Sequence, residues 1–166
     1  MRVAEIFQMQ KQLDAYIEKN HQLHGDDLFN KKVLALLVEL GELANETRCF
    51  KFWSLKAPSS KEVILEEFVD GVHFMLSLGI ECGFDSIAEI SAPNGERNGE
   101  TTITDQFIQV FEAIQAFRLS RSIHTYEKMF QQYLTLARLL GFSDDEIKEA
   151  YIAKNEVNYK RQEEGY

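Results

Sequence analysis

Apolar residues recur at helical spacing along nearly the whole chain, and only two prolines in 166 residues interrupt the pattern. In residues 2–20, for example, Ile6, Met9 and Leu13 follow the spacing that the buried face of an amphipathic helix requires. Because proline is excluded from helix interiors, its scarcity leaves long segments free to be helical. No segment shows the two-residue alternation of a half-buried strand. The sequence therefore predicts an all-α fold, a bundle of about six helices.

Residues that begin and end helices set the expected boundaries. Asp26 or Asp27 is the expected N-cap of the second helix, and Ser143 begins a capping box for the last one. Glycine often follows a helix, so Gly83 and Gly141 mark two C-termini. The expected helices are residues 2–20, a segment that begins near 28, a third that starts after Pro58-Ser59-Ser60 and continues through 63–83, then 105–121, 123–140 and 143–163, with a loop at 91–104.

The composition limits the class of protein. A chain of 166 residues suits a single domain, here residues 1–166. The net charge of −9 argues against general nucleic-acid binding, since phosphate backbones are held by clusters of lysine and arginine. No apolar run approaches the length that spans a membrane. Without a signal peptide, Cys49 and Cys82 are expected to be reduced thiols in a cytoplasmic protein.

The second expected helix is strongly apolar. Its Val, Leu and Ala side chains at positions 33–44 cover about 220° of the helix circumference, which leaves Glu39, Glu42 and Glu46 in the remaining wedge. We therefore expect this helix to be buried on most sides. Six helices of this length supply too few neighbours within one chain, so a second copy is expected to complete the core as a homodimer.

Two pairs of carboxylates with the same three-residue spacing, Glu39 with Glu42 and Glu67 with Asp70, fall on consecutive helices. This spacing places both side chains of a pair on one helix face. Solvated faces often produce such pairs, but Glu39 and Glu42 interrupt a very apolar segment, where an unpaired carboxylate is costly. Clustered carboxylates repel one another unless cations lie between them, and oxygen ligands suit Mg²⁺ or Mn²⁺. The pattern favours a metal site.

A second polar group lies on the last expected helix, where Lys154, Asn158 and Arg161 are spaced to share one exposed face. In so acidic a chain, a lysine and an arginine that flank an amide would suit a phosphate chain and a sugar hydroxyl. The alternative is a solvated basic stripe. Gln10 and Asp14 form a similar pair on the first helix, and by itself such a pair is most often plain helix surface.

Aromatic residues and a single histidine also have ordinary explanations. Phe50, Phe52 and Trp53 follow the second helix, and such clusters more often belong to a core or an interface than to a ligand. His73 has no partner histidine at metal-ligand spacing, so a hydrogen-bonded core or surface imidazole is favoured. There is no glycine-rich phosphate loop, nucleophile elbow or Cys-x-x-Cys pair. A phosphate ligand would therefore need metal or a local basic spot.

Five segments carry a resemblance to a known family: MQKQLD at 9–14, ELGEL at 39–43, FKFW at 50–53, EEFVDGVHF at 66–74 and KNEVNYKRQ at 154–162. They are similar to the dimeric all-α deoxyuridine triphosphatases, within the all-α nucleoside triphosphate pyrophosphatase group that includes the MazG-type enzymes. The acidic segments mark the broad group, and the last segment favours the deoxyuridine branch. The resemblance covers nearly the whole chain.

This resemblance implies hydrolysis of dUTP to dUMP and pyrophosphate with Mg²⁺, with Mn²⁺ as an alternative metal and dUDP as an alternative substrate. The metal ligands that it implies are Glu39, Glu42, Glu67 and Asp70. It also implies that Glu39 orients the attacking water. The metal-assisted attack would occur on the polyphosphate.

The same resemblance implies a set of substrate-binding residues: Phe74 stacked on uracil, Gln10 and Trp53 beside the base, Lys154 and Arg161 on the phosphates, and Asn158 on the deoxyribose. Asp14 stands where part of the family has an asparagine that contacts the base, and an aspartate cannot donate the same hydrogen bond. Phe50 stands where some relatives have a tryptophan.

Two other functions stay open. One is a MazG-like pyrophosphatase of broader base preference, which would share the metal site but not the uracil pocket. The other is a non-catalytic helical dimer that acts as a regulator. Substrate profiling separates the first from a deoxyuridine triphosphatase, and metal-dependent turnover excludes the second.

Overall fold

The computed structural model describes residues 1–23, 25, 27–92 and 102–165. Six helices make up the fold: α1 (Ala4–Asn20), α2 (Phe29–Thr47), α3 (Lys61–Glu81), α4 (Ile103–Ser120), α5 (Ile123–Leu139) and α6 (Asp144–Glu163). Outside the helices, the described residues contain one isolated β-bridge, between Arg2 and Glu89, and no strand. The predicted all-α fold is confirmed.

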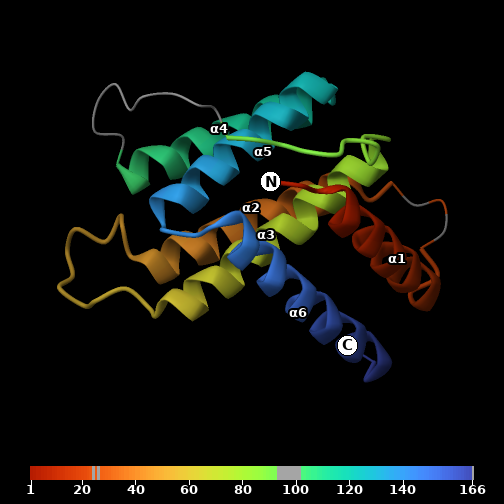
Figure 1. The fold of residues 1–166 in the computed structure, drawn as a ribbon, viewed down its shortest axis with the longest axis horizontal. Helices are drawn as coiled ribbons and strands as arrows, with labels where there is room; N and C mark the ends of the chain where they lie inside the picture. The colour runs from red at the N-terminus through yellow and green to blue at the C-terminus, as the bar shows by residue number, and fades with distance from the viewer. Residues whose placement is uncertain (24, 26, 93–101, 166) are drawn as a thin grey trace.

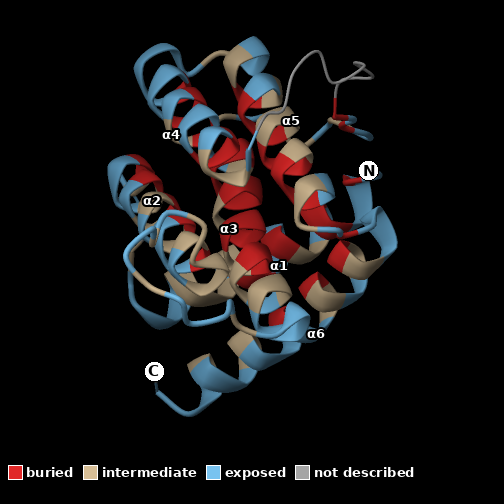
Figure 2. Cartoon of the chain, turned by 90° about the vertical axis from the view of Figure 1, so that its left-hand side faces the viewer, coloured by how far each residue is buried: buried red, intermediate tan, exposed pale blue. Residues whose placement is uncertain are grey.

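Helix α3 lies at the centre of the bundle (Figure 1). It packs against α1, α2, α5 and α6, while α4 covers α2 and α5 from the far side. Its second half is almost entirely buried, as Figure 2 shows. Gly71 and Gly79 permit the close approach of α5, because a side chain at either position would collide with the hydroxyl of Tyr133 or Tyr126. Helices α1, α2, α5 and α6 therefore all meet at α3.

The helix boundaries follow local signals, with one correction. Ser143 and Glu146 form the predicted capping box of α6. Helix α4 begins at Ile103, two residues before the predicted start. The expected N-cap of α2 is wrong, because Leu28 takes that position and has no side-chain cap hydrogen bond. Instead Asp27 accepts from the backbone N–H of Phe29 at 3.1 Å, while Asp26 lies outside the described residues.

Helix α3 begins at Lys61, directly after the predicted start signal at Pro58-Ser59-Ser60, and it ends at Glu81, two residues before Gly83. Gly83 and Gly141 both have positive φ, as expected of glycines that follow helices. The predicted loop at 91–104 ends earlier than expected, because Thr102 caps α4. Residues 93–101 of this loop lie outside the described part of the chain. Cys49 and Cys82 are free, half-buried thiols.

Within one chain, helix α2 is only partly buried, and part of its apolar surface stays exposed. Val33, Leu36 and Leu40 are buried against the bundle, but Leu34 is 63% exposed and Val38 is 51% exposed. These two residues lie one turn apart and form one apolar face that no described residue covers. Among the described residues, no helix is both long and apolar enough to cross a membrane.

Candidate functional site

Three carboxylates from two neighbouring helices meet beside α3. Glu39 comes from α2, and Glu67 and Asp70 come from successive turns of α3. One oxygen from each lies within 4.8 Å of the others, and all three side chains are half-buried. The three-residue spacing brings the α3 pair to one face, and the packing of α2 against α3 brings Glu39 to it. We call these three residues the acidic cluster.

The carboxyl groups of the acidic cluster have raised pKa values. Burial raises the pKa of Glu39 to about 7, and the neighbouring charges of Asp70, Glu42 and Glu67 add to this effect. Burial also raises the pKa values of Glu67 and Asp70. Such carboxylates are short of positive charge. Three hard oxygen donors within reach of one another fit a divalent cation such as Mg²⁺ or Mn²⁺.

Lys154 supplies the nearest positive charge, and its position differs from the expectation. The predicted exposed face of α6 does not include it, because the side chain of Lys154 is buried between α6 and α3. Its ammonium group forms ion pairs with Asp70 at 2.7 Å and with Glu66 at 2.9 Å. Hydrogen bonds to these carboxylates raise the pKa of Lys154, although burial opposes the rise. Lys154 therefore partly neutralises the acidic cluster.

Glu42 lies outside the acidic cluster. It is exposed on α2, one turn beyond Glu39, and no group of three ligand atoms among the described residues includes it. Its charge still raises the pKa values of Glu39 and Glu67, which places it close to both. Of the four predicted metal ligands, the structure brings three together and leaves Glu42 at their edge.

A cavity of about 370 Å³ extends from the acidic cluster along α3. Its walls come from α1, α2, α3 and α6. It is lined by seven of the predicted site residues: Gln10, Asp14, Glu39, Asp70, Phe74, Asn158 and Arg161. Asp70 and Ser77 both line it and are seven residues apart on α3, which corresponds to about 10 Å along the helix axis. The cavity therefore has an acidic end and a second, distant end.

The second end is a hydrogen-bonded network. Gln10 is buried rather than on plain helix surface, and its Nε2 donates to Asp14 at 2.7 Å. Ser77 on α3 donates to the other oxygen of Asp14 at 2.6 Å. The carbonyl oxygen of Gln10 lies 2.7 Å from Nδ1 of His73 and accepts from the Tyr151 hydroxyl at 2.8 Å. We call these five residues the polar network.

Burial shifts the pKa values of Asp14 and His73 in the polar network. It raises the pKa of Asp14, although hydrogen bonds from Ser77 and Gln10 oppose the rise. It lowers the pKa of His73 to about 3, with a smaller contribution from Lys154, so the imidazole is neutral at pH 7. His73 is the expected core imidazole, stacked on Tyr151 with ring centroids 4.2 Å apart. Among the described residues only its Nδ1 has a partner, since Nε2 is buried without one.

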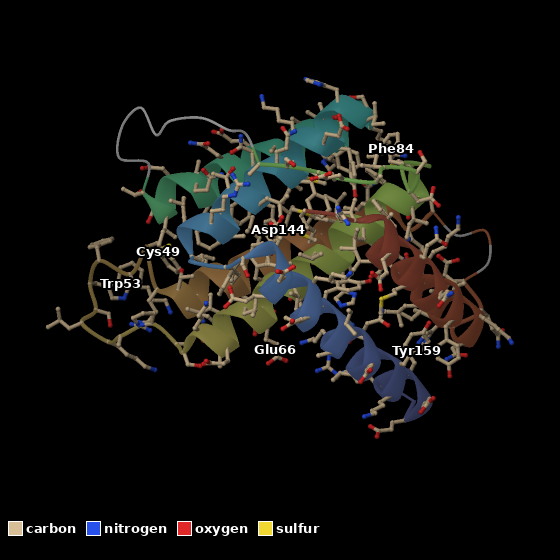
Figure 3. All side chains as sticks on the ribbon, viewed as in Figure 1. Cys49, Trp53, Glu66, Phe84, Asp144 and Tyr159 are labelled. Atoms are coloured by element: carbon tan, nitrogen blue, oxygen red, sulfur yellow. The ribbon has the colours of Figure 1, made fainter. Side chains whose placement is uncertain are left out.

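Trp53 does not line this cavity. It lies on the loop between α2 and α3, is 65% exposed, and contacts Phe50 and Phe52 edge-on. Figure 3 shows it at the opposite side of the molecule from Tyr159 on α6. Within one chain, the expectation that Trp53 lies near the base is therefore not supported by the geometry.

Sequence reasoning did not assign Ser77 or Tyr151 to the site. Ser77 follows Phe74 by three residues and Asp70 by seven, so helical spacing along α3 was a usable signal. Tyr151 precedes Lys154 by three residues on α6, but its contact with Gln10 joins positions 141 residues apart. No local pattern indicates such a contact.

An all-α bundle that holds a carboxylate cluster at the end of a cavity is typical of metal-dependent phosphate hydrolases. A family model described as dUTPase matches residues 2–166. The chain therefore belongs to this dUTPase family. A search of curated proteins finds no match. Family and fold together support a nucleotide-hydrolysing role, and the acidic cluster can hold the divalent metal that dUTPases generally use.

Proposed function

We propose that the protein hydrolyses dUTP to dUMP and pyrophosphate with Mg²⁺. The observation that carries this proposal is the pairing of two ends in one cavity, an acidic cluster and a polar network. The two α3 residues of that network, His73 and Ser77, lie three and seven residues beyond Asp70, about 5 and 10 Å along the helix axis. A nucleotide has the same division, with a polyphosphate at one end and a base at the other. The half-buried ring of Phe74, between the two ends, suits stacking against the base.

The residues at the acidic end of the cavity have separate roles in this proposal. Glu39, Glu67 and Asp70 hold the metal, and Glu39 orients the attacking water. Arg161 binds the phosphates as a bidentate donor, and Asn158 binds the deoxyribose. Lys154 keeps Asp70 in position through its ion pair and adds positive charge at the phosphate end. When bound, Mg²⁺ neutralises phosphate charge and lowers the pKa of a coordinated water.

Glu42 and Trp53 also have roles that differ from the predicted set. Glu42 acts from the edge of the acidic cluster, where its charge strengthens the attraction for a cation. Trp53 receives no role within one chain, because it lies on an exposed loop away from the cavity. The base is therefore contacted by residues of α1 and α3 alone in this proposal.

A nucleotide panel tests the proposal. Pyrophosphate release would be measured for dUTP, dUDP, dCTP, dTTP, dATP and dGTP, with Mg²⁺, with Mn²⁺ and with a chelator. We expect turnover of dUTP above the other triphosphates and none in chelator. Comparable rates for several bases would favour the broader MazG-like activity, and the absence of metal-dependent turnover would favour a non-catalytic helical dimer.

We also propose that the working form is a homodimer. Leu34 and Val38 form an exposed apolar face on α2, and a second copy of the chain would bury it. Analytical ultracentrifugation should give twice the mass of one chain, and Val38→Glu should yield a monomer. Val157→Glu is the matched control, because Val157 is an exposed valine on α6, away from this face. A monomeric wild-type protein would contradict the proposal.

A further inference from the structure

Every hydrogen-bonding position of the Gln10 amide except one has a partner among the described residues. Its oxygen faces two groups, the Tyr151 hydroxyl at 2.8 Å and His73 Nδ1 at 2.7 Å. Its nitrogen faces one oxygen of Asp14 at 2.7 Å. An amide nitrogen carries two hydrogens, so one of them is left. Because Gln10 lines the cavity, this hydrogen is available to a ligand there.

The orientation of the amide follows from the chemistry of its partners. An ionised Asp14 can only accept, so the side of Gln10 that faces it must be the nitrogen. The oxygen of Gln10 then faces Tyr151 and His73, so both must donate. The Tyr151 hydroxyl is closer to Gln10, at 2.8 Å, than to the carbonyl of Ile6, at 3.3 Å. His73 must carry its proton on Nδ1.

The opposite orientation has a clear cost. A flipped amide would place its oxygen against the carboxylate of Asp14. It would also require the Tyr151 hydroxyl to accept and His73 to carry its proton on Nε2, which is buried without a partner among the described residues. Three partners from three helices, α1, α3 and α6, therefore oppose the flip. Buried polar groups left unpaired are costly, so the network selects a single amide orientation. Gln10 thus presents a donor to the cavity.

We propose that Tyr151 and His73 are positioning residues that set the choice of base by fixing the Gln10 amide. This inference rests on the proposed function. With phosphates at the acidic end, the base edge farthest from the sugar faces the polar network. Uracil presents a carbonyl oxygen there, at C4, which accepts from Gln10. Cytosine presents an amino group at C4, and two donors would face each other.

Removal of the Tyr151 hydroxyl tests the proposal directly. The measurement is the ratio of the Kd of dCMP to the Kd of dUMP, by titration calorimetry in Mg²⁺, for wild type and for Tyr151→Phe. Loss of one of the three partners weakens the preference for this amide orientation, and we expect the ratio to fall by about five- to tenfold. Turnover of dUTP by the wild type is measured in parallel, as an independent check on the proposed function.

Tyr126→Phe is the matched control. Tyr126 is also fully buried, and its hydroxyl donates to the backbone carbonyl of Met75 at 3.0 Å, but it does not line the cavity. We expect this variant to lose stability without a change in the dCMP to dUMP ratio. An equal fall in both tyrosine variants would indicate general loosening of the core and would overturn the proposal.

Two further variants keep the test decisive if Tyr151→Phe folds poorly. His73→Phe removes the second donor while retaining an aromatic ring against Tyr151, and it should lower the ratio in the same way. Gln10→Leu removes the amide that contacts the base in this proposal. In that background Tyr151→Phe should cause no additional change, because positioning residues act only through Gln10.

The outcomes separate this inference from the proposed function. If the wild type hydrolyses dUTP but Tyr151→Phe and His73→Phe keep the wild-type ratio, the positioning role is wrong and the proposed function stands. If the wild type neither binds dUMP nor hydrolyses dUTP, both are wrong. A lower ratio in both variants, with an unchanged ratio in Tyr126→Phe, supports the positioning role.

Discussion

The two ends of the cavity differ in how far the protein alone satisfies them. At the acidic end, Glu39, Glu67 and Asp70 share one lysine, and burial raises the pKa of each carboxyl. At the other end, the amide of Gln10 and both oxygens of Asp14 have hydrogen-bond partners. The first end is incomplete without a cation, whereas the second is nearly complete and leaves one amide hydrogen of Gln10 for a ligand.

This difference indicates that the acidic end serves catalysis and that the polar network serves the choice of base. Charge that the fold leaves uncompensated creates affinity for a metal, and it costs stability when the metal is absent. Hydrogen bonds that the fold completes hold a fixed pattern of donors and acceptors, which suits recognition. Changes at the acidic end should therefore alter turnover and stability in opposite directions. Changes at the polar network should alter the choice of base.

Glu39→Gln should have the largest effect. It removes a charge from the acidic cluster with little change of size, so turnover of dUTP should fall on the order of 10²- to 10³-fold or more in saturating Mg²⁺. The free energy of unfolding without metal should stay level or rise, because one source of repulsion is gone. Steady-state kinetics and thermal melts measure the two quantities.

The matched control for this variant is Glu42→Gln. Glu42 is the exposed carboxylate at the edge of the acidic cluster, so its loss should reduce turnover less than the loss of Glu39. Turnover at the wild-type rate by Glu39→Gln would remove that residue from the chemistry. Equal losses in the two variants would contradict the division between the cluster and its edge.

Arg161→Ala should have the next largest effect, and it should act mainly on substrate binding. Arg161 is exposed and lines the cavity, and exposed positions rarely affect stability. We expect the KM for dUTP to rise, or turnover to fall, by about 1.5–3 kcal/mol, the range for a charged hydrogen bond. The melting temperature should not change. Lys160→Ala, its exposed neighbour outside the cavity, is the control and should keep wild-type kinetics.

Lys154→Met should behave differently from Arg161→Ala, although the sequence suggested a shared role. Lys154 is buried and paired with Asp70, so its loss leaves an unpaired carboxylate and should cost about 1–3 kcal/mol of stability. Mg²⁺ should restore part of this loss by replacing the missing charge. Lys148→Met is the control, because Lys148 pairs only with exposed Glu5 on the surface.

Denaturant unfolding with and without Mg²⁺ measures these changes. If Lys154→Met costs no more than Lys148→Met, the ion pair with Asp70 does not contribute to the fold. If Mg²⁺ stabilises wild type and Lys154→Met by the same amount, the lysine and the metal do not compensate for the same charge.

The helices were predictable from the sequence because their causes are local. Apolar spacing, the capping box at Ser143 and the glycines at 83 and 141 all act within a few residues. The meeting of Glu67 with Asp70 was predictable for the same reason. The burial of Lys154 was not, because it depends on how α6 crosses α3, and spacing along one helix does not determine that crossing.

The same limit explains the polar network and the apolar face of α2. Hydrogen bonds that join Asp14 to Ser77 connect residues 63 positions apart, so no local pattern contains them. The composition of α2 correctly indicated more apolar surface than one chain buries, since Leu34 and Val38 stay exposed. It did not indicate which side of the helix the chain itself would cover.

The smallest predicted effect is a dependence of metal-free stability on pH, with opposite signs at the two ends of the cavity. The folded-state pKa of Glu39, about 7, is above its ordinary value of 4.5, so the folded state holds more protons between these values. Its contribution to stability therefore falls as pH rises through this window. His73, whose pKa is lowered to about 3, contributes stability that is lost as pH falls below 6.5.

A comparison of wild type with Glu39→Gln isolates the acidic end, because His73 affects both proteins equally. Without metal, the free energy of unfolding of the variant should rise relative to that of the wild type from pH 5 to pH 8. After allowance for solvent screening of a half-exposed carboxylate, a gain of about 1 kcal/mol would raise the melting temperature by about 2–4 °C. Burial and the charges of Asp70, Glu42 and Glu67 raise the pKa of Glu39, while Lys154 lowers it. Because Mg²⁺ binds the ionised carboxylates, it should remove the stability advantage of the variant. A melting-temperature difference that stays constant across this range, measured by calorimetry, would show that the acidic end carries no uncompensated charge.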